Sequence, residues 1–377
     1  MSMSMRIGLI TTLNHNIGDD FIRIGLLKVL EKLLPGQQIE FVAINKHKPY
    51  TVYPGWHPVR VAGLAQYLPR AKTRVGNLIG SLLAAPALSK FTECDMVVQC
   101  GAPVLWPGCH DCEWTQPLWR DVVGSLYKRI PVFNLAAGSC YPWERQPSSV
   151  EDLDDAEFLS TIHSYCRLTT VRDRLSRDLF GSLGCQVPHL PCSALLAAGE
   201  PKSGLNGDGT ILINYIHGGT PNDFGQGVDA SVWRETVREV VARLRQRHQV
   251  AFICHNEAER RAAAEVSDGL PCYLPKTIDE YFEVASRAKA GIFNRMHASV
   301  GFAGLGIPSI AIGADTRLLM VEHLGLPCYY LKDAATATLE DKLEGLLMER
   351  ASQKERLLNL RRETMRSYVE AISSKFS

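Results

Sequence analysis

The residues best suited to chemistry in this chain are an arginine and a histidine two positions apart, Arg295 and His297. They follow a short apolar run at 290–293, which is typical of a buried strand, and they precede a helix of small residues at 298–305. The start of a helix presents free backbone N–H groups and the positive end of the helix dipole. A cation and an imidazole at this junction therefore predict an anion-binding site with an acid/base group beside it.

A second polar junction lies near the N-terminus. Residues 6–12 read as a strand, and a helix is expected over 18–34. Asn16 can cap this helix, Asp19 suits its first turn, and Gly18 allows a tight turn with close approach of a ligand. In parallel α/β folds, ligands bind at the carboxyl ends of strands. The two junctions are therefore predicted to face each other across a cleft.

Together these motifs resemble the polysaccharide pyruvyl transferase family. That family has an N-x-G-D turn near the N-terminus, an R-D-x-x-S helix start in mid-chain, and an R-x-H turn followed by a G-x-P strand. The resemblance runs from about residue 5 to about 335. The matching residues here are Asn16, Gly18 and Asp19; Arg172, Asp173 and Ser176; Arg295 and His297; and Gly306 and Pro308.

The resemblance implies an enzyme that moves the pyruvyl group of phosphoenolpyruvate onto a sugar or glycan precursor as a ketal, in cell-envelope or exopolysaccharide synthesis. This donor carries a carboxylate and a phosphate, and arginine pairs two oxygens at once. Arg172 and Arg295, one from each domain, are the candidate donor ligands. Two alternatives stay open: a surface ion pair of Arg172 with Asp173 or Asp178, and an internal ion pair of Arg295 with a carboxylate.

His297 is the strongest catalytic candidate. Pyruvyl transfer needs a proton delivered to the methylene carbon of the donor, and an imidazole with a pKa near ~6.5 serves as acid or base at neutral pH. A nearby phosphate would keep it more protonated. The alternative is a neutral core histidine. Asp19 fits two roles equally well, a base for the acceptor hydroxyl or a charge in the first turn of the helix.

Other candidates surround these. Gly218 and Gly219 follow a strand and can form an N–H nest for the donor, with a plain turn as the alternative. Arg317 stands near the position where the family often has a lysine. Gly101 belongs to an expected turn after the strand at 95–100, where Ala102 and Pro103 replace the family's usual glycines. The predicted acceptor contacts are His15, Asn16, Gly18 and Gly101.

Composition excludes several classes of protein. With 41 basic and 40 acidic residues, the chain has a net charge of +1, so no global field favours nucleic acid. It has no apolar span of 18 residues and no signal-peptide core at its start, which predicts a cytoplasmic protein. The apolar run at 76–88, with its basic lead-in at 70–74, leaves open peripheral contact with the inner membrane face or with a lipid-linked acceptor, although a buried helix is favoured.

The motifs call for no cofactor and no metal. The chain has 11 cysteines, which are expected to be mostly buried thiols in a cytoplasmic protein. Cys109 and Cys112 flank His110, and half of a zinc site is the alternative there.

The fold is predicted from alternating strand and helix patterns. Two doubly wound, Rossmann-like α/β domains in a glycosyltransferase-B-like arrangement are expected. The acceptor-side domain covers 1–198, a linker 199–209, the donor-side domain 210–335, and C-terminal helices at 336–377 would pack back on the first domain. Strands are expected at 6–12, 39–44, 95–100, 131–136, 167–171, 210–216, 250–254, 291–293 and 308–312, and helices at 18–34, 114–128, 150–164, 173–183, 228–248, 257–267, 278–287, 296–305 and 317–325.

Two other functions remain open at this stage. A glycosyltransferase of the same architecture would use a nucleotide sugar, with Glu322 as the only obvious acid for its ribose. A non-catalytic relative would bind a sugar or an anion without turnover. The acceptor sugar, the position of the ketal and the oligomeric state are not determined by the sequence.

Overall fold

The computed structural model describes residues 4–13, 16–48, 51, 56, 85, 87–112, 115–199, 209–221 and 224–376. His15, the basic lead-in at 70–74 and residues 200–208 of the expected linker lie outside the described residues.

The first half of the chain forms a five-stranded sheet in the order β2-β1-β3-β4-β5, and every pair of neighbouring strands is parallel. The strands are almost continuously apolar because helices cover both faces of the sheet. This is the alternation that the sequence predicts for the first half of the chain. The elements are β1 (Met5–Thr11), α1 (Ile17–Leu33), β2 (Ile39–Asn45), β3 (Met96–Leu105), a π-helical stretch (Thr115–Val123) that leads into α4 (Gly124–Leu126), β4 (Val132–Ser139), α5 (Leu153–Tyr165), β5 (Leu168–Val171) and α6 (Arg174–Ser182).

The second half forms a six-stranded parallel sheet in the order β11-β10-β9-β6-β7-β8. The expected pair of doubly wound α/β domains with C-terminal helices is therefore confirmed. The elements are β6 (Thr210–Asn214), α7 (Ala230–Leu244), β7 (Val250–Ile253), α8 (Glu257–Val266), β8 (Cys272–Tyr273), α9 (Ile278–Ala285), β9 (Ala288–Phe293), α10 (Met296–Gly304), β10 (Ser309–Gly313), α11 (Leu318–Glu322), β11 (Cys328–Tyr330), α12 (Thr336–Met348) and α13 (Arg350–Ser373).

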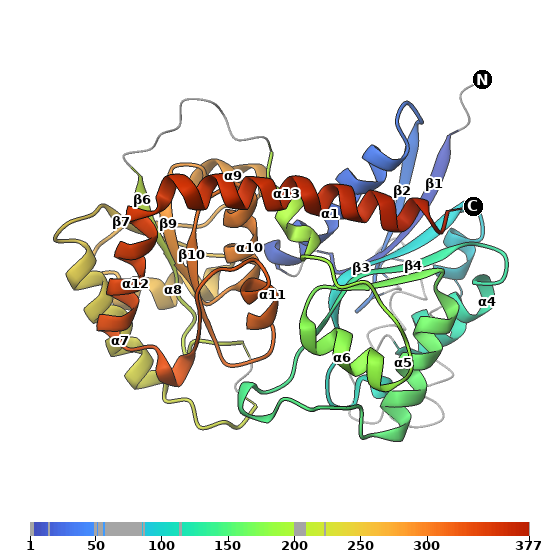
Figure 1. Ribbon diagram of the computed structural model, residues 1–377, viewed down its shortest axis with the longest axis horizontal. Coiled ribbons are helices and arrows are strands. Elements are labelled where there is room, and N and C mark those ends of the chain that lie inside the picture. Colours follow the sequence, from blue (N-terminus) through green and yellow to red (C-terminus); the bar gives the residue numbers. More distant parts are fainter. Residues whose placement is uncertain are drawn as a thin grey trace.

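The two domains lie side by side, and the long helix α13 crosses both of them (Figure 1). The hydroxyl of Tyr368 donates to the carbonyl of Pro191 at 3.0 Å, in the first half of the chain. Arg361 donates to the carbonyl of Ala198 at 2.9 Å and to that of Gly304 at 3.2 Å. Helix α13 therefore ties the second domain to the first.

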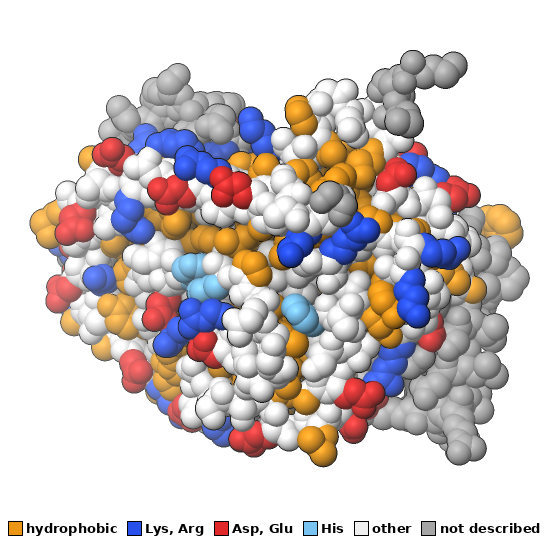
Figure 2. Space-filling model, turned by 45° about the vertical axis from the view of Figure 1, so that its right-hand side comes forward, with side chains coloured by type: hydrophobic (Ala, Val, Ile, Leu, Met, Phe, Trp, Pro, Cys, Tyr) orange, Lys and Arg blue, Asp and Glu red, His pale blue; other side chains and the backbone are white. Residues whose placement is uncertain are grey.

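A further set of contacts joins the domains beyond the end of β4. The hydroxyls of Ser139 and Thr316 are 2.8 Å apart, and the Thr316 hydroxyl also accepts from the backbone N–H of Tyr141 at 2.9 Å. The backbone N–H of Trp143 donates to the carbonyl of Ala314 at 3.1 Å. Acidic and basic side chains are interspersed over the face shown in Figure 2, in line with the near-zero net charge.

A short 3-10 helix, Ser193–Leu196, is wedged between α1 and α10, which belong to different domains. Each of these helices contributes a glycine at the contact. A Cβ on Gly25 would overlap the carbonyl of Ser193, and a Cβ on Gly304 would overlap that of Leu195. The close approach of the domains therefore depends on two residues that lack a side chain.

We expect Gly25→Ala to destabilise the protein by about 1–3 kcal/mol, because backbone atoms must move to admit the new methyl group. The measurement is chemical denaturation. Gly345→Ala is the matched control, since its Cβ would meet nothing within 4 Å and lies inside helix α12. The control should be stabilised by up to ~1 kcal/mol through helix propensity alone. Equal stability of the two variants would mean that the wedge is not tightly packed.

Candidate functional site

The two polar junctions meet at one pocket of about 60 Å³ between the domains. The first domain contributes Asn16 and Asp19 from the start of α1. The second contributes side chains that follow β6, β7, β9 and β10 at their carboxyl ends. These residues are Thr220, Pro221, His255, Asn294, Arg295, Met296, His297, Gly313, Asp315, Arg317, Leu318 and Met320.

His297 lies against an arginine of the other domain. Nη1 of Arg172 is 3.2 Å from Nε2 of His297. A guanidinium can only donate, so Nε2 accepts and the neutral ring carries its proton on Nδ1. Burial, and then the charges of Arg172 and Arg317, lower the pKa of His297 well below its ordinary value. His297 is therefore a neutral imidazole, because its pKa lies well below the value of 6.5 expected for a free histidine.

Arg172 is buried, with 1% of its surface exposed. Besides contacting His297, Nη1 lies 3.8 Å from Sγ of Cys192, and Nη2 has no hydrogen-bond partner in the described part of the chain. The neighbouring Asp173 instead caps α6 and accepts from the backbone and hydroxyl of Ser139. The alternative of a surface ion pair for Arg172 is therefore wrong. A buried cation without a counter-ion is costly, and an anionic ligand would relieve that cost.

Two glycines make room for this pair. A Cβ on Gly18 would lie 3.0 Å from Cβ and 3.1 Å from Nδ1 of His297. A Cβ on Gly138, at the end of β4, would overlap Nε of Arg172. Gly18 therefore allows the close approach of His297, whereas the sequence predicted the close approach of a ligand. Gly138 was not found from the sequence, because nothing in its local pattern separates it from an ordinary strand glycine.

His255 connects the domains through a chain of hydrogen bonds. Oδ1 of Asn16 caps α1 by accepting from the Gly18 N–H at 2.9 Å, and it lies 3.1 Å from Nδ1 of His255. Nε2 of His255 is 3.3 Å from the hydroxyl of Tyr281. Since the amide oxygen only accepts, Nδ1 of His255 donates and Nε2 accepts from the tyrosine. Burial lowers the pKa of His255 to about 4, so this arrangement persists at neutral pH.

Arg295 lines the pocket but already has a counter-ion. Its Nε and Nη2 lie 2.8 and 2.6 Å from Oε1 of the buried Glu259. Glu259 also accepts from the backbone N–H of His255 and from Nδ2 of Asn214. Burial pushes the pKa of Glu259 upward, but His255 and Arg295 outweigh burial and lower it. The internal ion pair that the sequence left open for Arg295 is therefore present.

Arg317 is paired in the same way. Its Nε and Nη2 lie 2.8 and 2.6 Å from the two carboxylate oxygens of Asp315. Both pocket-lining arginines thus have carboxylate partners, whereas Arg172 behind His297 has none among the described residues. Any unbalanced positive charge at the site is centred on Arg172.

The expected turn at Gly101 is wrong. Strand β3 continues to Leu105, and Gly101 is buried inside it, where a Cβ would meet Ile22 and the backbone of Ala136. The apolar residues beyond Cys100 extend the strand past the predicted end. Gly101 therefore lies in the core and is not among the residues that line the pocket.

The glycines after β6 have a turn-forming role. Gly218 and Gly219 have φ values of +76° and +74°, and a Cβ on Gly219 would overlap Leu331. Neither lines the pocket, in contrast to the predicted donor contact. They direct the chain so that the next two residues, Thr220 and Pro221, reach the pocket.

The two cysteines considered for zinc have different partners. Sγ of Cys109 lies 3.3 Å from Oδ1 of Asp155, while Sγ of Cys112 lies 2.8 Å from Oγ1 of Thr115. Asp155 also accepts from the backbone N–H of Gly108 and pairs with Nδ1 of His110 at 2.7 Å. This carboxylate therefore connects α5 to residues 108–110 through several hydrogen bonds.

The fold and the site define a class: a two-domain glycosyltransferase-B-type protein with an anion-suited pocket in its cleft. The family model described as "Polysaccharide pyruvyl transferase" matches residues 16–316. The chain therefore belongs to the polysaccharide pyruvyl transferase family, and the resemblance seen in its motifs is confirmed. A comparison with curated proteins found no match.

Solved structures support the fold. A UDP-N-acetylglucosamine 2-epimerase from Neisseria meningitidis is 11% identical, with a TM-score of 0.56 over 99% of this chain and 100% of that one. The same enzyme from Methanocaldococcus jannaschii is 13% identical, with a TM-score of 0.54 over 92% and 93%. At this identity the likeness concerns the fold alone. Within the described residues, no helix is both long and apolar enough to span a membrane.

Proposed function

We propose that this protein transfers the pyruvyl group of phosphoenolpyruvate to a pair of hydroxyls on a sugar or glycan precursor. The observation that carries the proposal is the buried guanidinium of Arg172, which has no carboxylate partner among the described residues and contacts His297 at 3.2 Å. A phosphate is the kind of ligand that would complete this arrangement.

The size of the pocket favours a compact donor. Its volume of about 60 Å³ is far below the ~300–1,000 Å³ of sites that hold drug-sized ligands. A nucleotide sugar would not fit there without opening of the domains. The glycosyltransferase alternative therefore receives less support from this pocket than the pyruvyl transferase does.

The reaction balances with the groups available. A proton adds to the methylene carbon of the donor and leaves a cationic centre at the neighbouring carbon, which a sugar hydroxyl attacks with loss of its proton. The bond from that carbon to the phosphate oxygen then breaks, inorganic phosphate departs, and a second hydroxyl adds with loss of its proton. The products are the ketal and one hydrogen phosphate, and the protons from the two hydroxyls balance those gained by the new methyl group and the phosphate.

His297 suits the proton transfers in this scheme. Its Nε2 accepts a hydrogen bond from Arg172. A donor phosphate that engages Arg172 would release Nε2 and would raise the pKa of the ring by adding negative charge. Asp19, which lines the pocket from the opposite domain, is the candidate base for the acceptor hydroxyl.

The test is incubation of the protein with phosphoenolpyruvate and a pool of glycans, followed by phosphorus and proton NMR. We expect release of inorganic phosphate only when an acceptor is present, together with a new methyl singlet from the ketal. Pyruvate formation without a ketal, or turnover of UDP-sugars in place of phosphoenolpyruvate, would contradict the proposal.

A further inference from the structure

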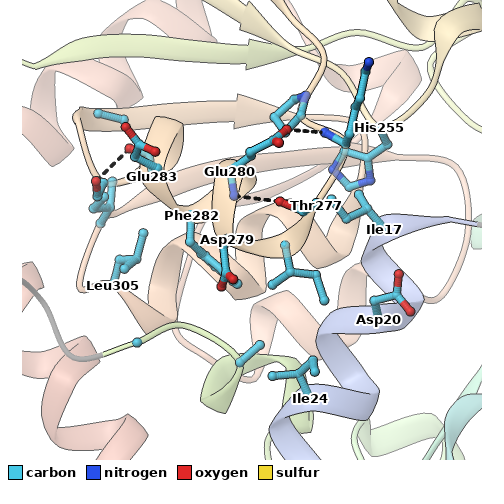
Figure 3. Close-up of a pocket in the computed structure, with 18 of the residues that line it drawn as sticks. Ile17, Asp20, Ile24, His255, Thr277, Asp279, Glu280, Phe282, Glu283 and Leu305 are labelled. Carbon is cyan, nitrogen blue, oxygen red and sulfur yellow. Dashed lines mark hydrogen bonds between the residues drawn. The ribbon is translucent and has the colours of Figure 1, made fainter.

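A second, much larger space adjoins the pocket. It is a groove of about 1,130 Å³ between α1 of the first domain and α9 of the second, and it ends near the start of α13. Figure 3 shows Ile17, Asp20 and Ile24 of α1 facing Asp279 and Phe282 of α9 across this space.

The groove and the small pocket share two residues, Asn16 and His255. These are the residues that hydrogen-bond to each other across the domains at 3.1 Å. The interdomain contact of Asn16 with His255 therefore borders both spaces. A ligand in the groove would lie next to the reaction pocket at this point.

The lining of the groove combines apolar surface with hydrogen-bonding groups. Ile17, Ile24 and Phe282 form apolar walls, while Asn256 and Thr277 offer polar groups beside them. A sugar ring has the same duality, since its C–H faces pack on apolar side chains and its hydroxyl edges form hydrogen bonds.

The charged groups that line the groove are close to balance. Five carboxylates and four cations contribute to its lining: Asp20, Glu257, Asp279, Glu280 and Glu283, and Lys28, Lys276, Arg350 and Lys354. Such a mixed lining offers hydrogen-bond donors and acceptors to neutral hydroxyls, and it has no excess of positive charge that would favour the diphosphate of a nucleotide sugar.

We propose that this groove is the acceptor site, and that it binds a neutral oligosaccharide of more than one residue whose terminal sugar reaches the small pocket at Asn16 and His255. The inference rests on the proposed function for the identity of the reaction. The groove itself supplies the chemical class and the extended length of the acceptor.

The experiment is saturation-transfer NMR with a pool of neutral di- and trisaccharides of hexose and N-acetylhexosamine. Wild-type protein should transfer saturation to members of the pool. Ile24→Trp fills the groove from α1, and we expect it to reduce binding at least tenfold. Asp279→Ala removes a hydrogen-bonding group at an exposed position where folding is not at risk, and it should weaken binding several-fold.

The matched control is Lys32→Trp, which adds the same bulk to an exposed position of α1 that does not line the groove. It should bind the pool as the wild type does. Each protein is also titrated with phosphoenolpyruvate in a thermal-shift assay, and Ile24→Trp should keep the wild-type shift.

The outcomes separate the two proposals. Sugar binding that Ile24→Trp blocks supports the groove, even if phosphoenolpyruvate gives no shift in any variant, in which case only the donor assignment falls. The groove proposal is overturned if no sugar of the pool binds, if Ile24→Trp and Lys32→Trp bind equally, or if UDP-N-acetylglucosamine binds in the groove in place of the neutral sugars.

Discussion

Replacing His297 with glutamine should lower kcat by about 10²–10⁴-fold, the range typical of a lost general acid or base. Glutamine offers an amide oxygen that can still accept from Arg172, so the interdomain contact at 3.2 Å has a substitute. What the variant loses is the ability to carry a proton. The measurement is the initial rate of phosphate release with phosphoenolpyruvate and an acceptor.

His163→Gln is the control for this variant, because His163 is a partly buried histidine on α5 whose pKa burial also lowers. Its rate should match that of the wild type. A His297→Gln enzyme within a few-fold of wild-type activity would move the proton transfer to another group, with Asp19 the next to test.

Proton uptake gives this prediction a readout that a structural role would not affect. Before the donor binds, His297 is neutral because its pKa lies well below its ordinary value of 6.5. If the donor phosphate raises that pKa, binding takes up a proton, and affinity rises as the pH falls from the bound-state pKa toward the free-state pKa. Calorimetry in two buffers of different ionisation enthalpy counts the protons. The count should be lower in His297→Gln than in the wild type, and the protonation of the ligand itself cancels in that difference.

The fold could be read from the sequence because its main strands are continuous apolar runs between recognisable helices. Two strands were missed. β8 (Cys272–Tyr273) and β11 (Cys328–Tyr330) have two and three residues at the edges of the second sheet. A run this short carries no usable periodicity, and only the neighbouring strand defines it.

The site was predictable where chain topology dictates proximity. Asn16 and His297 lie near the carboxyl ends of parallel strands, and the cleft between such domains brings these ends together. Their partners could not be predicted in the same way. Glu259 pairs with Arg295 from 36 residues away, and Tyr281 on helix α9 hydrogen-bonds to His255 in the loop after β7. Such pairs depend on how the helices pack against each other, and a local sequence pattern does not predict that packing.

The three candidate arginines look alike in the sequence, but they differ in whether a carboxylate neutralises them. Arg295 and Arg317 are bound to carboxylates that are themselves nearly buried. A ligand at either of these arginines would have to compete with an existing ion pair. A ligand at Arg172 would instead displace the neutral imidazole of His297 and the weak contact with the Cys192 thiol. Arg172 is therefore the residue whose loss should affect donor binding most.

Replacing Arg172 with methionine should abolish stabilisation by phosphoenolpyruvate. In the wild type, a ligand at 100 times its Kd stabilises by about 2.7 kcal/mol. Loss of a charge-assisted contact in a buried site costs about 2–5 kcal/mol, which removes most or all of that gain. Without ligand the expectation has the opposite sign. Methionine replaces a buried cation that lacks a carboxylate partner in the described chain, so the empty variant should be as stable as the wild type or more stable.

If Arg172 binds the ligand, its loss should remove the stabilisation by phosphoenolpyruvate without lowering the stability of the ligand-free protein. A structural arginine would show the reverse. Thermal unfolding with and without phosphoenolpyruvate measures both quantities in one experiment. Arg177→Met is the control, since Arg177 is exposed on α6 and pairs with the exposed Asp178 at 2.8 Å. It should keep the wild-type shift because its charge is exposed to solvent and already paired with Asp178. A less stable Arg172→Met protein that still gained stability from phosphoenolpyruvate would show that Arg172 supports the fold. The donor phosphate would then have to bind at Arg295 or Arg317, in competition with Glu259 or Asp315.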